Sequence, residues 1–429
     1  MFNFVPGAAN KTIDDDTRKA IIATVLDAAN REFMLVLRAP NPEQHAQVQA
    51  RVTNLVHGEL RKFTLSPETP VIEALVTDIM RRLTGLGFLD ALLPPVRTDL
   101  SEIAIYSTGL FQVMRKEKTN WETIPTAADA GEVMRVLSLI LGPQSKALTE
   151  ATPEVRAKLP ATEANPAGGR VTALHPVIVP GTGYPCVNIR LFEQKPVLPE
   201  WLLERKQMTQ EMMAYLQHAI ASGQRILICG STSSGKTTLL SALCNFLPPQ
   251  WRTIKIEDPS EIWIDRPNIQ TIEARIVPPG SEVASYTLRH GVDVAMRLSP
   301  DYLIVGEVRD GAAALALLRA ASSGHPGSCT FHAESPADAF ERMSMLMGTD
   351  CGITDRRAFQ NIVSGLDMLV QLTKRGNRRQ VTSIVKVEKK LRSGEPRYIP
   401  VFRLDEDADP EAPSWTRIAE GQAATEDTQ

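Results

Sequence analysis

The sequence predicts an α/β protein whose carboxyl-terminal half forms a parallel sheet around a phosphate-binding loop. From about residue 226, short and wholly apolar stretches alternate with helix-like stretches, a pattern typical of parallel sheets covered on both faces. The first apolar stretch, 226–229, leads directly into GSTSSGKT at 230–237, and a helix-like stretch follows. The pattern GxxxxGK[ST] between a strand and a helix indicates a nucleotide-binding loop.

The amino-terminal half predicts a helical segment followed by a small α/β domain. Through 1–92, apolar residues recur at three- and four-residue steps, as at Ile21, Val25 and Leu75, which indicates helices. From 93 to 192 the sequence pattern changes to short strand-like runs around one helical stretch. We expect strands at 100–106, 110–113, 171–174 and 186–191 and a helix at 131–141.

A linker at 193–200, EQKPVLPE, precedes the nucleotide-binding domain, because proline-rich polar stretches stay extended. The domain itself is expected to span 201–405. We expect strands at 226–229, 253–256, 302–305 and 328–331, and helices at 236–247, 285–298 and 311–321. Beyond it, 406–429 is acidic and contains prolines, which predicts a flexible tail.

Composition excludes several classes of function. The chain has 429 residues with 47 Lys plus Arg against 50 Asp plus Glu, a net charge of −3, and therefore lacks the basic excess of a non-specific nucleic-acid or membrane binder. Its five cysteines form no CxxC pair, so we expect neither a disulfide framework nor a zinc site. The first residues lack signal-peptide features, and no apolar run approaches a membrane span. We expect a cytoplasmic protein without a transmembrane segment.

The loop at 230–237 predicts binding of a nucleoside triphosphate with Mg²⁺. Small residues let backbone N–H groups converge on phosphates, and the following helix amino terminus favours negative charge. Lys236 supplies a positive charge to the β- and γ-phosphates, and the Thr237 hydroxyl is a ligand for Mg²⁺. The predicted nucleotide-binding residues of this motif are Gly230, Ser231, Thr232, Ser233, Ser234, Gly235, Lys236, Thr237 and Thr238.

Two acidic clusters follow apolar strands and are candidates for orienting an attacking water. Glu257 ends TIKIE, and Glu307 ends YLIVGE with Arg309 shortly after. The carboxyl ends of parallel strands face the ligand, so both clusters are expected beside the phosphates. A helix cap or a surface turn is the alternative for either cluster alone. Gly306 stands where a generic Walker-B strand has Asp, which leaves Glu307 as the candidate water-orienting residue, with a role toward Mg²⁺ directly or through water.

His332 ends the next apolar strand after Glu307, in GHPGSCTFHAESP. It is therefore expected to reach the γ-phosphate edge of the site. A hydrogen-bonded structural histidine is the alternative. No neighbouring carboxylate or histidine has a metal-ligand spacing.

In this order, the segments GSTSSGKTT, TIKIEDPSEI, RLSPDYLIVGEVRDGAA and SGHPGSCTFHAESP resemble the motifs of the hexameric traffic ATPases of type II and type IV secretion. Those motifs are a Walker-A loop, an acidic Asp box, a Walker-B strand ending in Gly-Glu, and a His box. The resemblance covers about 202–387 and accounts for Gly306. It implies a RecA-like domain preceded by a smaller, PAS-like α/β domain.

The amino-terminal half carries a looser resemblance. LTGLGFLDALL at 83–93 is similar to tight-adherence pilus ATPases and their conjugative relatives, and the four-cysteine zinc insert of type II secretion ATPases is absent. GGRVTALHPVIVPG and the later NIR resemble strands that bring two arginines onto the nucleotide. By this resemblance, Arg170 and Arg190 contact phosphates and stabilise charge, and Arg309 is an interface or sensor residue. Here GTGYPCVN replaces a more uniform loop.

The resemblance implies a homo-hexamer that hydrolyses ATP with Mg²⁺, using Glu307, Glu257 and His332. It also implies a cytoplasmic protein held at the inner membrane by secretion or pilus platform proteins, with no direct sequence-specific nucleic-acid binding. Two other hypotheses are an ATP-binding assembly scaffold without turnover and a small-molecule kinase. Intact Lys236 and Thr237 argue against the scaffold, and the Asp and His boxes have no role in a kinase.

Overall fold

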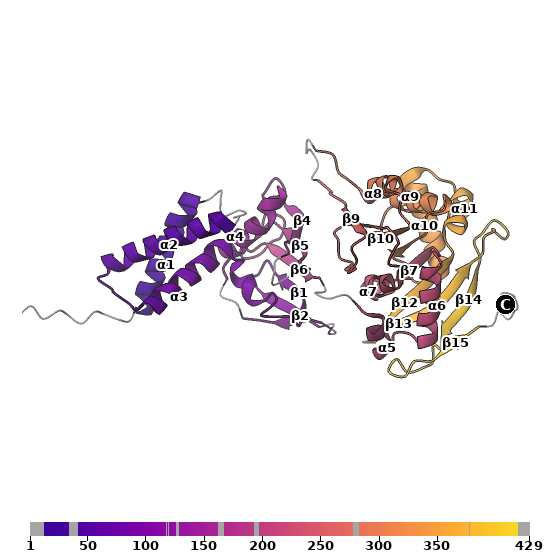
Figure 1. Cartoon of the computed structure of the whole chain (residues 1–429), viewed down its shortest axis with the longest axis horizontal. Coiled ribbons are helices and arrows are strands. Elements are labelled where there is room, and N and C mark those ends of the chain that lie inside the picture. The colour runs from indigo at the N-terminus through magenta and orange to yellow at the C-terminus, as the bar shows by residue number, and fades with distance from the viewer. Residues whose placement is uncertain are drawn as a thin grey trace, which may run out of the picture. The chain divides into compact units, whose positions relative to one another are not determined.

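The computed structural model divides the chain into two compact units, 1–192 and 193–429 (Figure 1). The structure describes residues 13–33, 42–116, 118, 120–125, 128–161, 167–192, 197–277, 283–376 and 378–418. The stretch examined for a signal peptide, the first half of the expected linker and the end of the expected tail lie outside these residues. Each unit has its own hydrophobic core, and the two are described separately.

The first unit begins with three helices, α1 (Asp15–Phe33), α2 (Pro42–Lys62) and α3 (Thr69–Thr84). Each presents apolar residues at helical spacing, and these meet in one cluster that includes Ile21, Val52 and Ile79. The helical segment expected in this region is therefore a small bundle with its own core. A short 3-10 helix, η1 (Gly87–Ala91), leads out of it.

A six-stranded antiparallel sheet completes the first unit, with the order β3-β2-β1-β6-β5-β4. Its strands are β1 (Leu100–Ile105), β2 (Phe111–Arg115), β3 (Glu122–Thr123), β4 (Glu154–Leu159), β5 (Gly169–Leu174) and β6 (Cys186–Leu191). Helix α4 (Ala130–Leu141) begins at Asp129, which accepts from Glu132 N at 2.8 Å, and η2 (Gly142–Gln144) follows the helix. Alternate strand residues pack with α4, as Val171 and Ile189 do, which leaves the other face polar.

The second unit contains a nine-stranded sheet in the order β15-β14-β13-β12-β7-β11-β10-β8-β9. Its strands are β7 (Ile226–Gly230), β8 (Thr253–Glu257), β9 (Ile269–Glu273), β10 (Tyr302–Val308), β11 (Gly327–Phe331), β12 (Met368–Arg375), β13 (Arg378–Val387), β14 (Tyr398–Leu404) and β15 (Trp415–Arg417). The adjacent strands β9, β8, β10, β11, β7 and β12 pair in parallel. Strands β13, β14 and β15 continue the sheet beyond β12 in antiparallel pairing. One strand, β11, lies between β7 and β10, and β12 flanks β7 on its other side; this is a RecA-like order, and the predicted fold class is confirmed.

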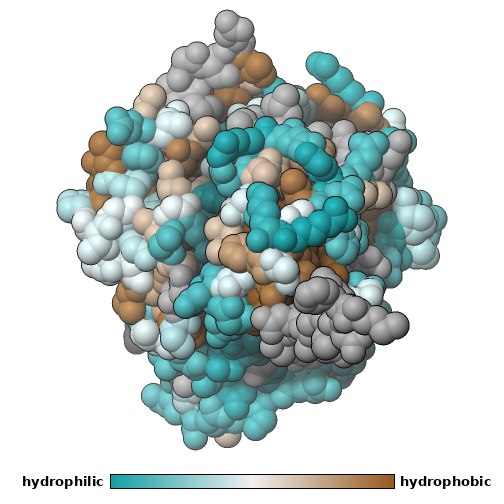
Figure 2. Space-filling model, turned by 90° about the vertical axis from the view of Figure 1, so that its left-hand side faces the viewer, coloured by the Kyte–Doolittle hydropathy of each residue, from teal (hydrophilic) through white to brown (hydrophobic). Residues whose placement is uncertain are grey.

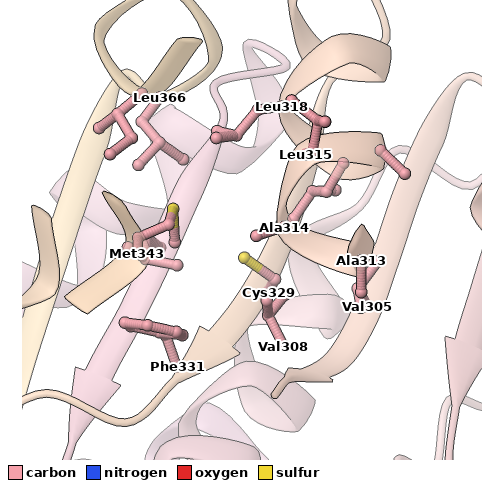
Figure 3. Packing of buried hydrophobic residues seen from close by; sticks show 14 of the residues in the cluster. Val305, Val308, Ala313, Ala314, Leu315, Leu318, Cys329, Phe331, Met343 and Leu366 are labelled. Carbon is pink, nitrogen blue, oxygen red and sulfur yellow. The ribbon is translucent and has the colours of Figure 1, made fainter. Parts of the chain in front are cut away.

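Helices cover both faces of this sheet. They are α5 (Pro199–Glu204), α6 (Gln210–Ala221), α7 (Lys236–Leu243), η3 (Cys244–Phe246), α8 (Leu288–Ala295), η4 (Met296–Leu298), α9 (Gly311–Ser322), α10 (Pro336–Cys351) and α11 (Asp355–Gly365). On one face, Ala314 and Leu318 of α9 pack against Val305 of β10 and Cys329 of β11, with Met343 of α10 beside them (Figure 3). These strands are apolar along their whole length because both faces are buried.

Three expected elements differ in the structure. The helix expected at 236–247 is shorter, because α7 ends at Leu243 and the 3-10 turn η3 follows it. The helix expected at 285–298 is shorter: α8 begins at Leu288, where Thr287 and His290 form a capping box, and it ends in the 3-10 turn η4. The 406–429 stretch was expected to be a flexible tail, yet β15 pairs with β14 within it. Trp415 there donates its indole N–H to Val381 O at 2.7 Å.

One face of the first unit shows how its exposed apolar residues are distributed. On the face in Figure 2, hydrophobic residues lie among hydrophilic ones rather than in one continuous patch. Across the ranges that the structure describes, no helix combines the length and the apolar character that crossing a bilayer requires.

Candidate nucleotide site

The phosphate loop connects the buried strand β7 to the first turn of α7. Ser233 has φ of 61° and Gly235 has φ of 96°, so both adopt the left-handed region that turns the chain into the helix. Gly230 admits no side chain, because a Cβ there would lie 2.4 Å from Leu372 O. The loop is therefore a tight turn at the carboxyl edge of the sheet, directly before a helix amino terminus, which is a favourable place for an anion.

Lys236 is buried at the start of α7, and its ammonium group stays inside the loop. Its Nζ donates to Gly230 O at 2.9 Å and to Ser231 O at 2.8 Å, and lies 3.4 Å from His332 Nδ1. Only 7% of the residue is exposed, so its hydrogen bonds to carbonyls offset the cost of burying the charge. The sequence predicts that this cation binds the phosphates, and in the structure it bonds to the carbonyls of Gly230 and Ser231 at the start of the loop.

Glu307, the candidate water-orienting residue, lies near the end of β10 and has two basic neighbours. Its Oε1 lies 2.8 Å from His332 Nε2, and its Oε2 accepts from Arg309 Nε at 2.6 Å. His332 thereby bridges Glu307 and Lys236 through its two ring nitrogens. The neutral ring with a proton on Nε2 satisfies both contacts, since it donates to the carboxylate and accepts from the ammonium.

The surroundings of His332 favour that neutral ring. Partial burial lowers the pKa of His332 from its usual 6.5, and the nearby Lys236 charge lowers it further, while Glu307 acts in the opposite direction. The structure thus brings together Lys236, His332 and Glu307, three residues that the sequence placed on separate strand ends. With the 3.4 Å contact between Lys236 Nζ and His332 Nδ1, these three residues form a continuous series of contacts.

Glu257 has a different environment from the one that the sequence suggested. The residue is 2% exposed, and its Oε1 accepts from Glu261 N at 3.0 Å and Ile262 N at 2.9 Å. Its Oε2 accepts from Ser260 Oγ at 2.9 Å and pairs with the buried Lys255 Nζ at 2.8 Å. Both oxygens of Glu257 therefore bond within the turn after β8, which indicates that the carboxylate holds this turn. Its role in water activation stays a prediction.

Glu257 also explains Gly306, the unusual residue of the Walker-B strand. A Cβ at Gly306 would lie 2.8 Å from Glu257 Cγ and 3.2 Å from its Oε1. The buried carboxylate occupies the space where an Asp side chain would otherwise be. The missing aspartate is thus a packing consequence of the neighbouring strand.

Thr237 and Thr238 lie half-buried in the first turn of α7. Their donor chemistry suits Mg²⁺ held jointly with phosphates, because Mg²⁺ keeps several waters and binds through few protein oxygens. One hydroxyl from Thr237 and one carboxylate from Glu307 match that pattern. Within the described residues, no group of three or more His, Cys, Asp or Glu side chains could hold a metal on its own.

A pocket of about 650 Å³ opens beside these groups, between the phosphate loop, the ends of β10 and β11, and α10. Its polar groups include two arginines and one carboxylate. Its lining includes Ser231, Thr232, Arg309, His332, Glu334 and Arg342. Arg342 carried no signal in the sequence, because a lone arginine on a helix resembles a solvated surface charge.

Arg170 and Arg190 lie in the first unit, directly opposite each other on β5 and β6. Lys158 stands opposite Arg170 on β4, and Glu102 stands opposite Arg190 on β1. This row lies on the polar face of the sheet, away from the α4 core. Like charges placed opposite each other disfavour strand pairing, and Glu102 brings a negative charge into the same row. The role of these arginines at the nucleotide stays a prediction.

Comparison with known proteins assigns the family. Residues 132–396, more than half of the chain, match the family described as "Type II/IV secretion system protein". The chain belongs to this family. The assignment agrees with the resemblance seen in the four motifs.

The family includes bacterial and archaeal relatives. An uncharacterized protein of Methanocaldococcus jannaschii is 31% identical over 66% of this chain and 49% of its own length, so the match spans about half of that relative. The type IV secretion system protein VirB11 of Bartonella henselae is 29% identical over 68% of this chain and 91% of its own length. The X-ray structure of the ATPase DotB of Legionella pneumophila is 20% identical, covers 80% of this chain and 85% of that chain, and has a TM-score of 0.49.

Proposed function

We propose that this protein is a hexameric ATPase that hydrolyses Mg·ATP to power type IV secretion or pilus assembly across the bacterial inner membrane. The observation that carries the proposal is the continuous contact from Lys236 through His332 to Glu307 beside the phosphate loop. It supplies a phosphate-binding cation, a hydrogen-bonding imidazole and a carboxylate within one site. Membership of the type II/IV secretion family supports a role for this hydrolysis in secretion or pilus assembly.

In this mechanism, the loop N–H groups, Lys236 and Thr238 bind the phosphates. Mg²⁺, when bound through Thr237, neutralises charge on the phosphate oxygens. Glu307 accepts a hydrogen bond from the attacking water and orients it for in-line attack. His332 holds the orientation of that carboxylate through Nε2, since the contact is 2.8 Å.

Arg309 donates to Oε2 of Glu307, and this oxygen keeps a second lone pair that can accept from water. The Arg309 side chain is 47% exposed, so it has room to move if it turns away from the carboxylate. Arg170 and Arg190 would add positive charge at the phosphates from the first unit. Loss of these contacts after hydrolysis would release the first unit and so convert chemistry into movement.

The proposed function also implies the partners of the protein. A motor of this kind acts on inner-membrane platform proteins of a secretion or pilus system, and we place the protein in the cytoplasm, attached to that membrane through them. Direct sequence-specific binding of nucleic acid is not part of the proposal. The net charge of −3 is consistent with contact through protein surfaces.

The test of hydrolysis is phosphate release by the full chain with Mg·ATP, compared with Glu307→Gln. The variant keeps the shape of the side chain but removes its charge, so we expect turnover to fall by about 10²-fold or more. Glu341→Gln is the matched control, because Glu341 is an exposed carboxylate of α10. Equal, near-background release by wild type and Glu307→Gln would leave the ATP-binding scaffold as the better account.

The test of assembly is size analysis at micromolar concentration with and without Mg·ATP. A hexamer is expected with nucleotide. A monomer under the same conditions would overturn the hexameric motor while leaving the nucleotide site in place.

A further inference from the structure

Arg379, distant in sequence, contacts the phosphate loop. It lies in β13, and its Nε donates to Ser233 O at 3.0 Å across 146 positions of sequence. Its aliphatic stem lies along the loop, since a Cβ at Gly235 would be 3.2 Å from Arg379 Cδ. The guanidinium therefore bonds to one loop residue while its stem covers another.

The carbonyl that Arg379 bonds belongs to a residue with unfavourable backbone geometry. Ser233 has φ of 61°, a region that disfavours residues with a Cβ, and the turn there helps to aim the next N–H groups at the phosphates. A hydrogen bond from a charged donor is stronger than one from a neutral donor. Arg379 thus stabilises the loop conformation in which the phosphate-binding groups converge.

The hairpin that carries Arg379 is held in place on both sides of it. Arg378 forms an ion pair with Glu411, and Gln380 donates from Nε2 to Pro410 O at 2.8 Å. Val381 donates its N–H to Gln207 O at 2.9 Å. Arg379 is exposed itself but is flanked by anchored residues, so its position relative to the loop is defined.

We propose that Arg379 is a positioning residue of the phosphate loop, acting through the Ser233 carbonyl and not on the nucleotide. The proposal rests on the proposed function only in that the loop binds phosphate groups. It requires Arg379 to affect the affinity for anything that the loop binds, including inorganic pyrophosphate. It also requires the chemical step to stay nearly unchanged once ligand is bound.

The experiment measures dissociation constants of the full chain for Mg·ADP and for inorganic pyrophosphate, together with kcat and KM for ATP. We expect Arg379→Ala to weaken both ligands by about 5- to 30-fold and to raise KM with little change in kcat. Arg379→Lys keeps a charged donor and is expected to recover part of the affinity. Lys374→Ala is the matched control, because Lys374 is an exposed cation directly opposite Arg379 in the β12–β13 ladder.

Four results would overturn the proposal. Weaker ADP binding with unchanged pyrophosphate binding would place Arg379 on the nucleoside. A fall in kcat at constant KM would place it on the transition state. Wild-type affinities in Arg379→Ala, or no recovery in Arg379→Lys, would remove the carbonyl contact as the cause. Because binding is read separately from turnover, a chain that binds ADP but does not hydrolyse ATP would refute the proposed function alone.

Discussion

Replacement of Glu257 by Gln separates a structural role from a catalytic one. The amide keeps one oxygen for the N–H groups of Glu261 and Ile262 but turns an N–H₂ toward Lys255 and Ser260, which are donors themselves. The Lys255 side chain, 7% exposed, then has no counter-charge from this residue. Breaking a buried ion pair on one side costs about 3–5 kcal/mol. We expect Glu257→Gln to destabilise the second unit by about that amount.

Urea unfolding followed by tryptophan fluorescence suits this measurement, because four of the five tryptophans lie in the second unit. With a slope of about 3 kcal/mol per molar urea, the midpoint should fall by about 1–1.7 M. The double variant Lys255→Met with Glu257→Gln removes the buried charge as well. It is expected to recover part of the loss, since removing both members of a buried pair costs less than removing one.

The refuting result is specific. If Glu257→Gln kept the wild-type urea midpoint and its phosphate release fell to the level of Glu307→Gln, the carboxylate would act on water. The structural assignment of Glu257 would then be wrong, and the role first suggested by the sequence would be restored.

Two further predictions concern neighbouring groups. Because the pKa of His332 is lowered, its neutral form and the stability that depends on it are present above pH 6.5 and are lost as the pH falls through the lowered pKa. The acid limb of the kcat/KM profile should therefore lie below pH 6.5 and should disappear in His332→Gln. An unchanged acid limb in that variant would contradict this prediction. Gly306→Ala should destabilise the second unit by about 1–3 kcal/mol, because its Cβ meets the immobilised Glu257 at 2.8 Å; a neutral result in urea unfolding would show that the carboxylate can move aside.

Local pattern was enough to predict the phosphate loop and the parallel strands around it. The loop depends on small residues between a strand and a helix, all within one stretch of sequence, and wholly apolar strands indicate a sheet buried on both faces. The same pattern marks Gly306 as a departure from a generic Walker-B strand. Its packing cause is not local, because the Glu257 side chain that fills the space belongs to a strand about fifty residues earlier.

Long-range contacts account for what the sequence did not reveal. Strand β4, EVRAKL, alternates between charged and apolar residues. Its three charged side chains make the segment look polar, so the sequence did not indicate a strand there. Glu257 and Glu307 both end apolar strands, and only their donors distinguish them. Arg379 is one of several arginines in RGNRR, and its partner Ser233 lies 146 positions away. Single-sequence patterns carry no information on such pairs.

The beginning of the stretch expected to be a tail, 406–411, contacts the beginning of the second unit. Lys206 lies just beyond the expected linker, and its Nζ donates to Glu411 O at 2.9 Å, while the next residue, Gln207, accepts from Val381. The point where the chain enters the second unit is therefore bonded both to this segment and, through Val381, to the strand that carries Arg379. The start of the second unit is thereby linked to the phosphate loop through Val381, Arg379 and the Ser233 carbonyl.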